Sequence, residues 1–231
     1  MAGTDLVVRI GVFDSGVGGL TVLAQIKKYL PYAELVYIGD TARVPWGVRS
    51  PKVVTEFAIQ LLRFLEKKSI TYIVVACHTA SAVSIPDLKK VSKLLLTGVI
   101  DPTVEIVVSK TRGHVGIIAT PTTILSGAWE RVIKKKDKHV KVSSIAAPLL
   151  VPIVEAGLEN HKIASIMVGE YTNYLTREGI DTLVLACTHY PLLLPTFRKI
   201  LPNIELINPG EETAKYLSTV IKETQGDNKH F

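Results

Sequence analysis

The sequence predicts an α/β protein made of two similar lobes, each with a parallel sheet. Runs of buried, mostly β-branched residues alternate with stretches of helical periodicity, a pattern typical of parallel strands covered by helices. Landmarks of the first half recur in the same order in the second half, at an offset of 105 to 110 residues, which is too long for a solenoid. The clearest landmark is an apolar run that leads into a cysteine, and the chain has only two cysteines.

The chain opens with a predicted strand over residues 7–13, a glycine-rich loop over 14–19 and a helix over 20–30. Such a loop presents backbone N–H groups at a helix N-terminus, which suits a carboxylate or a phosphate. Thr21 stands where a dinucleotide fingerprint requires glycine, so a nicotinamide or flavin cofactor is rejected. Asp14 is either a helix cap or a working carboxylate, and this stretch alone favours the cap.

A second strand over residues 34–40 ends in Asp40 and leads into a loop, 41–47, that contains Trp46 and Gly47. This loop is either a shaped functional surface or a connection whose tryptophan covers the core. The next elements predicted are a long amphipathic helix over 50–68, a strand over 70–76 that leads into Cys77, and a helix over 86–96.

The second half repeats this plan. Residues 114–120 match 9–15, residues 141–148 match 34–41, and residues 180–186 match the strand before Cys77 and lead into Cys187. These matches indicate two lobes of common ancestry with a cleft between them. Glu155 follows an apolar run, and the sequence alone favours a first-turn helix acid at this position.

Composition excludes several classes of protein. With 47% hydrophobic and 21% charged residues in 231, the chain is globular, and no apolar run reaches the roughly 18 residues that span a bilayer. No secretory leader pattern opens it, so we expect a cytoplasmic protein with reduced cysteines. The net charge of +6 includes a lysine-rich run at 134–138 that is typical of a solvated helix end. We therefore expect small anionic substrates and no nucleic-acid partner.

The two thiols are the main candidates for chemistry. A lone cysteine after a strand is more often an inert small hydrophobe. Equivalent strands in facing lobes, however, would bring Cys77 and Cys187 to opposite faces of one ligand, and inversion of a carbon stereocentre needs a proton acceptor on one face and a donor on the other. A zinc site lacks the usual ligand spacing, and a disulfide lacks an oxidising compartment. Acyl transfer by Cys187 with His189 remains open, although it leaves Cys77 unexplained.

Four motifs together resemble the glutamate racemases, the cofactor-independent enzymes that supply D-glutamate for peptidoglycan. They are DSGVGGLTVL at 14–23, GDTARVP at 39–45, AC at 76–77 with TASA at 79–82, and CTHYPLL at 187–193. The resemblance runs from about residue 10 to residue 214. It implies two pseudo-symmetric Rossmann-like lobes with the active site in the cleft between them. The N-terminal lobe would comprise residues 1–98 plus 208–231 and the C-terminal lobe residues 99–207, in a chain that forms a homodimer.

The resemblance also implies roles for individual residues. Cys77 and Cys187 match the catalytic acid/base thiols, Asp14 and His189 match assisting groups, and Glu155 falls where the family has an active-site glutamate. We expect neither a cofactor nor a metal. The positions expected to bind substrate are Asp14, Ser15, Asp40, Trp46, Gly47, His78, Thr79, Thr120, Thr188 and His189. Because one thiol must be anionic while the other is protonated, we expect a bell-shaped pH dependence.

Some positions depart from the family pattern. His78 stands in place of the usual Asn, Trp46 in place of Tyr, Ala186 in place of Gly and Asn208 in place of a frequent Asp. Aspartate racemases and broader amino-acid racemases share the paired cysteines, while the THYP and GDTAR phrases favour glutamate. A non-catalytic regulatory or binding protein on the same scaffold stays open, although the intact thiols favour an enzyme.

Overall fold

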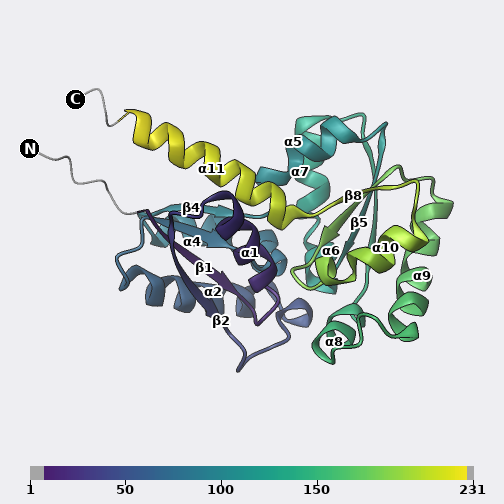
Figure 1. Ribbon diagram of the computed structural model, residues 1–231, viewed down its shortest axis with the longest axis horizontal. Helices are drawn as coiled ribbons and strands as arrows, with labels where there is room; N and C mark the ends of the chain where they lie inside the picture. The colour runs from purple at the N-terminus through teal and green to yellow at the C-terminus, as the bar shows by residue number, and fades with distance from the viewer. Residues whose placement is uncertain (1–7, 228–231) are drawn as a thin grey trace, which may run out of the picture.

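The computed structural model describes residues 8–227 and contains two parallel sheets of four strands each (Figure 1). The first sheet has the order β2-β1-β3-β4 and the second the order β6-β5-β7-β8, so the two lobes share one topology. The strands are β1 Arg9–Asp14, β2 Glu34–Gly39, β3 Tyr72–Val75, β4 Leu95–Gly98, β5 His114–Ala119, β6 Lys141–Ala146, β7 Thr182–Ala186 and β8 Glu205–Ile207. The predicted fold class is confirmed.

Helices follow the strands as expected for parallel sheets. They are α1 Leu20–Tyr29, α2 Pro51–Glu66, α3 His78–Val83, α4 Ile85–Val91, α5 Asp101–Lys110, α6 Pro121–Ser126, α7 Ala128–Lys136, α8 Leu150–Glu155, α9 Lys162–Arg177, α10 Leu194–Ile200 and α11 Pro209–Asp227, with short 3₁₀ turns η1 Trp46–Val48 and η2 Tyr190–Leu193. Local sequence explains several ends. Ser50 caps α2, where its hydroxyl accepts from the Val53 N–H at 3.4 Å, and Gly127 takes the left-handed conformation (φ +62°) between α6 and α7.

Each sheet buries apolar side chains on both faces. In the first lobe, α2 covers one face and helices α1 and α11 cover the other, although α11 lies at the far end of the sequence (Figure 1). In the second lobe, α9 and α10 pack on one face while α5 and α7 pack on the other. A strand that is buried on both faces is a continuous run of apolar residues, and most of the strands could therefore be predicted from the sequence.

The structure corrects the prediction of one helix over residues 86–96. Helix α4 ends at Val91, and residues 95–98 form strand β4, whose Leu95 and Thr97 pair with Tyr72 and Val74 of β3. A short apolar run such as 94–96 fits either a helix or a buried strand, and pairing with β3 decides between them. The sequence reading also did not identify β8 or the helix α3, which begins directly after Cys77.

Because all strands within each sheet are parallel, their carboxyl ends lie along one edge of that sheet, where ligands bind in open α/β proteins.

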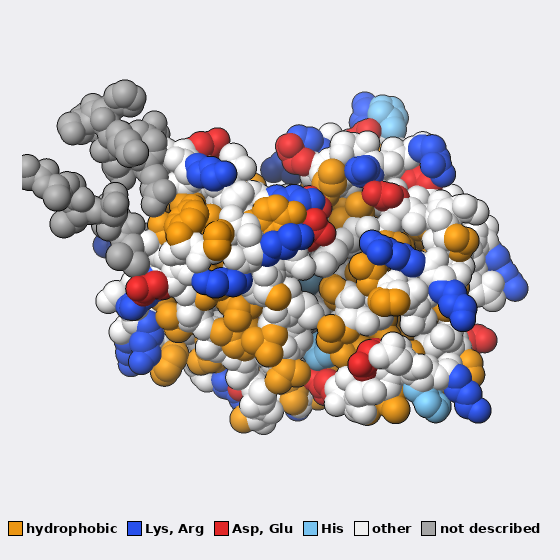
Figure 2. All heavy atoms as spheres, in the orientation of Figure 1, with side chains coloured by type: hydrophobic (Ala, Val, Ile, Leu, Met, Phe, Trp, Pro, Cys, Tyr) orange, Lys and Arg blue, Asp and Glu red, His pale blue; other side chains and the backbone are white. Residues whose placement is uncertain are grey.

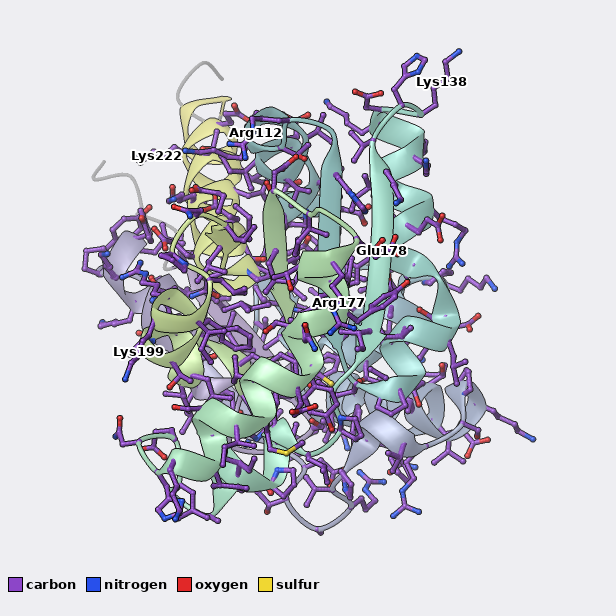
Figure 3. All side chains as sticks on the ribbon, turned by 90° about the vertical axis from the view of Figure 1, so that its right-hand side faces the viewer. Arg112, Lys138, Arg177, Glu178, Lys199 and Lys222 are labelled. Atoms are coloured by element: carbon purple, nitrogen blue, oxygen red, sulfur yellow. The ribbon has the colours of Figure 1, made fainter. Side chains whose placement is uncertain are left out.

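Charged side chains also lie on other parts of the surface. Lys138, Lys199 and Lys222, for example, point outward from the molecule (Figure 3). On the face shown in Figure 2, lysine and arginine side chains are spread in small groups. Within residues 8–227, no helix is both long and apolar enough to cross a membrane.

Candidate active site

A cavity of about 310 Å³ lies where the carboxyl ends of strands from both sheets meet. The thiols of Cys77 and Cys187 both line it, and only 4% and 6% of these residues' surfaces are exposed. The complete lining is Ser15, Val44, Pro45, Trp46, Gly47, Val48, Cys77, His78, Thr79, Thr120, Pro121, Pro148, Val151, Pro152, Glu155, Cys187, Thr188 and His189. The two cysteines therefore share one site that is built by both lobes.

The two thiols occupy equivalent places in the fold. Cys77 follows β3 and precedes the first turn of α3, while Cys187 follows β7, the strand of the second sheet that corresponds to β3. Burial raises the pKa of Cys77 to about 11, and the nearby Asp14 carboxylate adds to the rise. Burial also raises the pKa of Cys187, and negative charge on Cys77 raises it further. Both groups are therefore thiols near neutral pH.

Asp14 lies behind the cavity wall, fully buried at the end of β1. Its Oδ2 accepts hydrogen bonds from the N–H groups of Gly16 and Gly19, each at 3.0 Å, whereas its Oδ1 has no hydrogen-bond partner among residues 8–227. Burial raises the pKa of this carboxyl, and the charge of His189 opposes the rise. A raised pKa brings a carboxyl closer to the range in which it can exchange a proton at neutral pH.

Cys187 is part of a chain of polar groups. Its Sγ lies 3.8 Å from Nδ1 of His189, and Nε2 of His189 lies 3.0 Å from Oε1 of Glu155. Glu155 is at the end of α8, where its side chain is 38% exposed, while the His189 side chain is 6% exposed. A carboxylate on the far nitrogen stabilises an imidazolium, so this arrangement allows His189 to take a proton from Cys187.

Hydroxyl groups join the lobes beside the thiols. Oγ1 of Thr79 lies 2.9 Å from Oγ1 of Thr120, and Thr122 donates a hydrogen bond to the Arg49 carbonyl at 2.8 Å. Gly47 lies so close to Thr120 that a Cβ added at Gly47 would be 2.6 Å from the Thr120 Cβ. This wall of the cavity is therefore tightly packed across the lobe boundary.

His78 is the most unusual polar residue of the lining. The residue is 3% exposed, neither ring nitrogen has a hydrogen-bond partner in the described part of the chain, and the ring stacks on Trp129 with 6.3 Å between centroids. Burial lowers the pKa of His78 to about 3, so the ring is neutral at physiological pH. An unpartnered buried imidazole that lines a cavity has an unfilled hydrogen-bonding capacity.

Most of the predicted site residues come together at this cavity. Its lining includes Cys77, Cys187, His189, Glu155, Ser15, Trp46, Gly47, His78, Thr79, Thr120 and Thr188. Asp14, which was also expected to bind substrate, is fully buried outside the lining and acts on the site through the charge that it places near Cys77. Asp40 lies outside the lining, and its carboxylate instead pairs with Arg43 at 2.6 Å, so the expected direct contact between Asp40 and a ligand does not match its placement.

Sequence reasoning did not single out the prolines Pro121, Pro148 and Pro152 of the wall or the hydroxyl of Thr123, which lies 2.9 Å from that of Thr120. For Pro121 and Pro148 the signal was their position shortly after strands that were expected to end at the cleft, whereas Thr123 and Pro152 lie within helices α6 and α8 and gave no such signal. Within residues 8–227, no three side chains of the His, Cys, Asp or Glu type lie together in a way that could hold a metal ion.

Comparison with known proteins agrees with the geometry. Residues 10–217 match the family model described as Asp/Glu/Hydantoin racemase. The glutamate racemase of Persephonella marina is 43% identical over 209 residues, which cover 90% of this chain and 80% of that protein. The glutamate racemase of Aquifex pyrophilus is 41% identical over 216 residues, which cover 93% of this chain and 84% of that protein.

Solved structures give the same result. The glutamate racemase isoform RacE1 of Bacillus anthracis superposes with a TM-score of 0.91 at 39% identity, covering 94% of this chain and 82% of that chain. The glutamate racemase of Francisella tularensis in complex with D-glutamate gives a TM-score of 0.89 at 35% identity, covering 94% of this chain and 82% of that chain. With this sequence similarity, this fold and two thiols in one cavity, the chain belongs to the aspartate/glutamate racemase family of amino-acid racemases.

Proposed function

We propose that this protein is a glutamate racemase that interconverts L- and D-glutamate by proton transfer at Cα, and that it supplies D-glutamate for peptidoglycan. One thiol, as the thiolate, removes the Cα proton from one face of the substrate, and the other thiol delivers a proton to the opposite face. The observation that carries the proposal is that Cys77 and Cys187 line one small buried cavity from opposite lobes. The glutamate racemase names of similar proteins support the choice of substrate.

The neighbours of each thiol support a division of labour. Asp14 would accept or hold the proton of Cys77, whose charge it influences directly. His189, backed by Glu155, would do the same for Cys187. Since burial raises the pKa of both thiols, these partners would be needed to form a thiolate at neutral pH. The ammonium group of the substrate would also lower the barrier to removal of the Cα proton.

The substrate itself would be held by the remaining lining. The hydroxyl groups of Ser15, Thr79 and Thr188 and the backbone at Gly47 can donate hydrogen bonds to carboxylate oxygens. His78 bears on the choice of substrate, because its imidazole differs in size and hydrogen bonding from the Asn that the family usually has at this position. An aspartate racemase or a broader amino-acid racemase is therefore the second candidate.

The direct test is incubation with L-glutamate in deuterated water. Deuterium should appear at Cα together with D-glutamate, as followed by mass spectrometry and chiral chromatography. Cys77→Ser and Cys187→Ser should each lower the rate by about 10²-fold or more, because a hydroxyl is a far weaker acid than a thiol. Full racemisation by the Cys187→Ser protein would contradict the two-thiol mechanism. Aspartate in parallel reactions tests the alternative substrate.

We also propose that the chain acts as a homodimer in the cytoplasm. Large apolar side chains that are about half exposed near the site support a contact with a second copy; they include Val17, Leu20, Val48 and Leu192. Light scattering after size-exclusion chromatography tests this, and a mass of one chain at micromolar concentration would contradict it.

For the domains, we propose one unit of residues 1–98 plus 208–231 and another of residues 99–207. Packing of α11 supports this division, because Ala214 and Leu217 share a core with Ile10 and Val22 of the first lobe. Residues 1–7 and 228–231 lie outside the described part of the chain. In hydrogen exchange, α11 should be protected together with β1 and not with β5.

A further inference from the structure

The glycine-rich loop after β1 is held by a tyrosine from the neighbouring strand. Tyr37 lies on β2, opposite Val12 of β1, and its hydroxyl donates a hydrogen bond to the Gly16 carbonyl at 2.5 Å. Tyr37 is not part of the cavity lining. Its hydroxyl therefore acts on the loop and not on a ligand.

The contact leaves little room for the loop to move. A Cβ added at Gly39 would lie 2.3 Å from the Gly16 carbonyl oxygen, so that carbonyl rests directly against the backbone of β2. A Cβ added at Gly19 would lie 2.8 Å from the Tyr37 hydroxyl and 2.4 Å from the Cβ of Asp14. The tyrosine hydroxyl, the loop and the Asp14 side chain are thus packed as one group.

The same loop reaches Cys77. Both the hydroxyl and the N–H of Ser15 act on the thiol through hydrogen bonds that lower its pKa, against the larger effect of burial. Asp14 and Cys77 also act on the Tyr37 hydroxyl. Burial raises the pKa of Tyr37 far above its ordinary value, and the charges of Asp14 and Cys77 raise it further, so the hydroxyl stays protonated and remains a donor.

We propose that Tyr37 is a positioning residue for Cys77, because its hydroxyl fixes the loop that brings Ser15 to this thiol, while Asp14 is held in place at the end of β1. The inference rests on the proposed function, in which Cys77 is one of the two acid/base groups. The tyrosine touches neither the cavity nor the second thiol, so its influence is specific to one side of the site.

The second lobe offers a matched control. Tyr190 is fully buried next to Cys187, and its hydroxyl donates a hydrogen bond to the Ala147 carbonyl at 2.8 Å. Replacing either tyrosine by phenylalanine removes one hydroxyl that donates to one backbone carbonyl. Tyr37→Phe and Tyr190→Phe are therefore equivalent changes near different thiols.

The test is the rate at which each cysteine of the intact protein reacts with iodoacetamide as pH is raised, measured by mass spectrometry of the two peptides. In Tyr37→Phe the Cys77 profile should move to higher pH, so that its rate at fixed pH falls about threefold to tenfold, while the Cys187 profile stays in place. The turnover of glutamate should fall by a similar factor with its alkaline limb shifted. Tyr190→Phe should leave the Cys77 profile unchanged.

Gly39→Ala provides a second route to the same displacement, because the added Cβ meets the Gly16 carbonyl without removing the tyrosine hydroxyl. It should also shift the Cys77 profile alone. If Tyr37→Phe leaves the Cys77 profile as in the unmodified protein, or shifts both thiols equally, the assignment is overturned. Because alkylation needs no substrate, a protein that fails to racemise glutamate but shows the Cys77 shift would overturn the proposed function and not the role of Tyr37.

Discussion

Replacement of His78 by asparagine should make the protein more resistant to acid. Neither ring nitrogen of this buried histidine has a hydrogen-bond partner within the residues that the structure describes, and burial lowers the pKa of the ring from an ordinary value of 6.5 to about 3. The unfolded chain therefore binds a proton at His78 below pH 6.5, whereas the folded chain does so only near pH 3. Below pH 6.5 the proton favours the unfolded state, and the stability of the folded state falls as pH decreases.

The size of this effect follows from the shift. Each pH unit between the two pKa values changes the free energy of unfolding by about 1.4 kcal/mol, so roughly 3 kcal/mol is lost at about pH 4.5, two units below the ordinary value. His78→Asn removes this loss because asparagine does not titrate. The difference in unfolding free energy between the variant and the unmodified protein should therefore shift by about 3 kcal/mol in favour of the variant between pH 7.5 and pH 4.5.

Urea unfolding followed by tryptophan fluorescence at several pH values measures this difference. His78→Phe is a useful companion, since it keeps an aromatic ring against Trp129 and also lacks the titrating nitrogens. The two variants will differ in absolute stability, but their pH dependence relative to the unmodified protein should be the same. If the difference in unfolding free energy between each variant and the unmodified protein stays constant from pH 7.5 to pH 4.5, the pKa of His78 is not lowered by burial and this account is wrong.

Three further predictions concern the cavity and the lobe contact. Gly47→Ala should lower kcat/KM about tenfold and reduce the melting temperature, because its Cβ would be 2.6 Å from Thr120; an unchanged kcat/KM would contradict this packing. Between pH 9 and pH 11 deprotonation of Cys77 in the unfolded chain should lower the free energy of unfolding of the unmodified protein by about 2 kcal/mol, and urea unfolding of Cys77→Ala should show a loss that is smaller by this amount. Thr122→Val should lower the free energy of unfolding by about 1 kcal/mol, since it removes the hydrogen bond to the Arg49 carbonyl, and an equal urea midpoint would show that the bond contributes nothing.

Much of the fold could be predicted from the sequence because its strands are buried on both faces and its halves repeat. The matching runs before Cys77 and Cys187 correspond to β3 and β7, which hold the same place in the two sheets. Two of the four edge strands, β4 and β8, were missed, whereas the edge strands β2 and β6 were predicted. β4 and β8 are short, and their strand character comes from pairing with a neighbour and not from local pattern.

The candidate site was predicted in part for the same reason. Residues directly after strand ends, such as Ser15 and Thr120, could be expected at the cleft, and they line it. Distances between side chains could not be predicted. Asp40 also follows a strand, yet it pairs with Arg43, and the contact between Tyr37 and the Gly16 carbonyl depends on the register of two neighbouring strands.

The unequal surroundings of the two thiols have a kinetic consequence. Cys77 lies near Ser15 and Asp14, whereas Cys187 lies near His189, whose far nitrogen contacts Glu155, so the enzyme does not present mirror-image environments to mirror-image substrates. The two enantiomers nevertheless have the same free energy in water, which fixes their equilibrium ratio at unity. The value of kcat/KM must then be equal in both directions. Any asymmetry of the protein can therefore change kcat and KM only by the same factor, so the enantiomer with the lower KM also has the lower kcat.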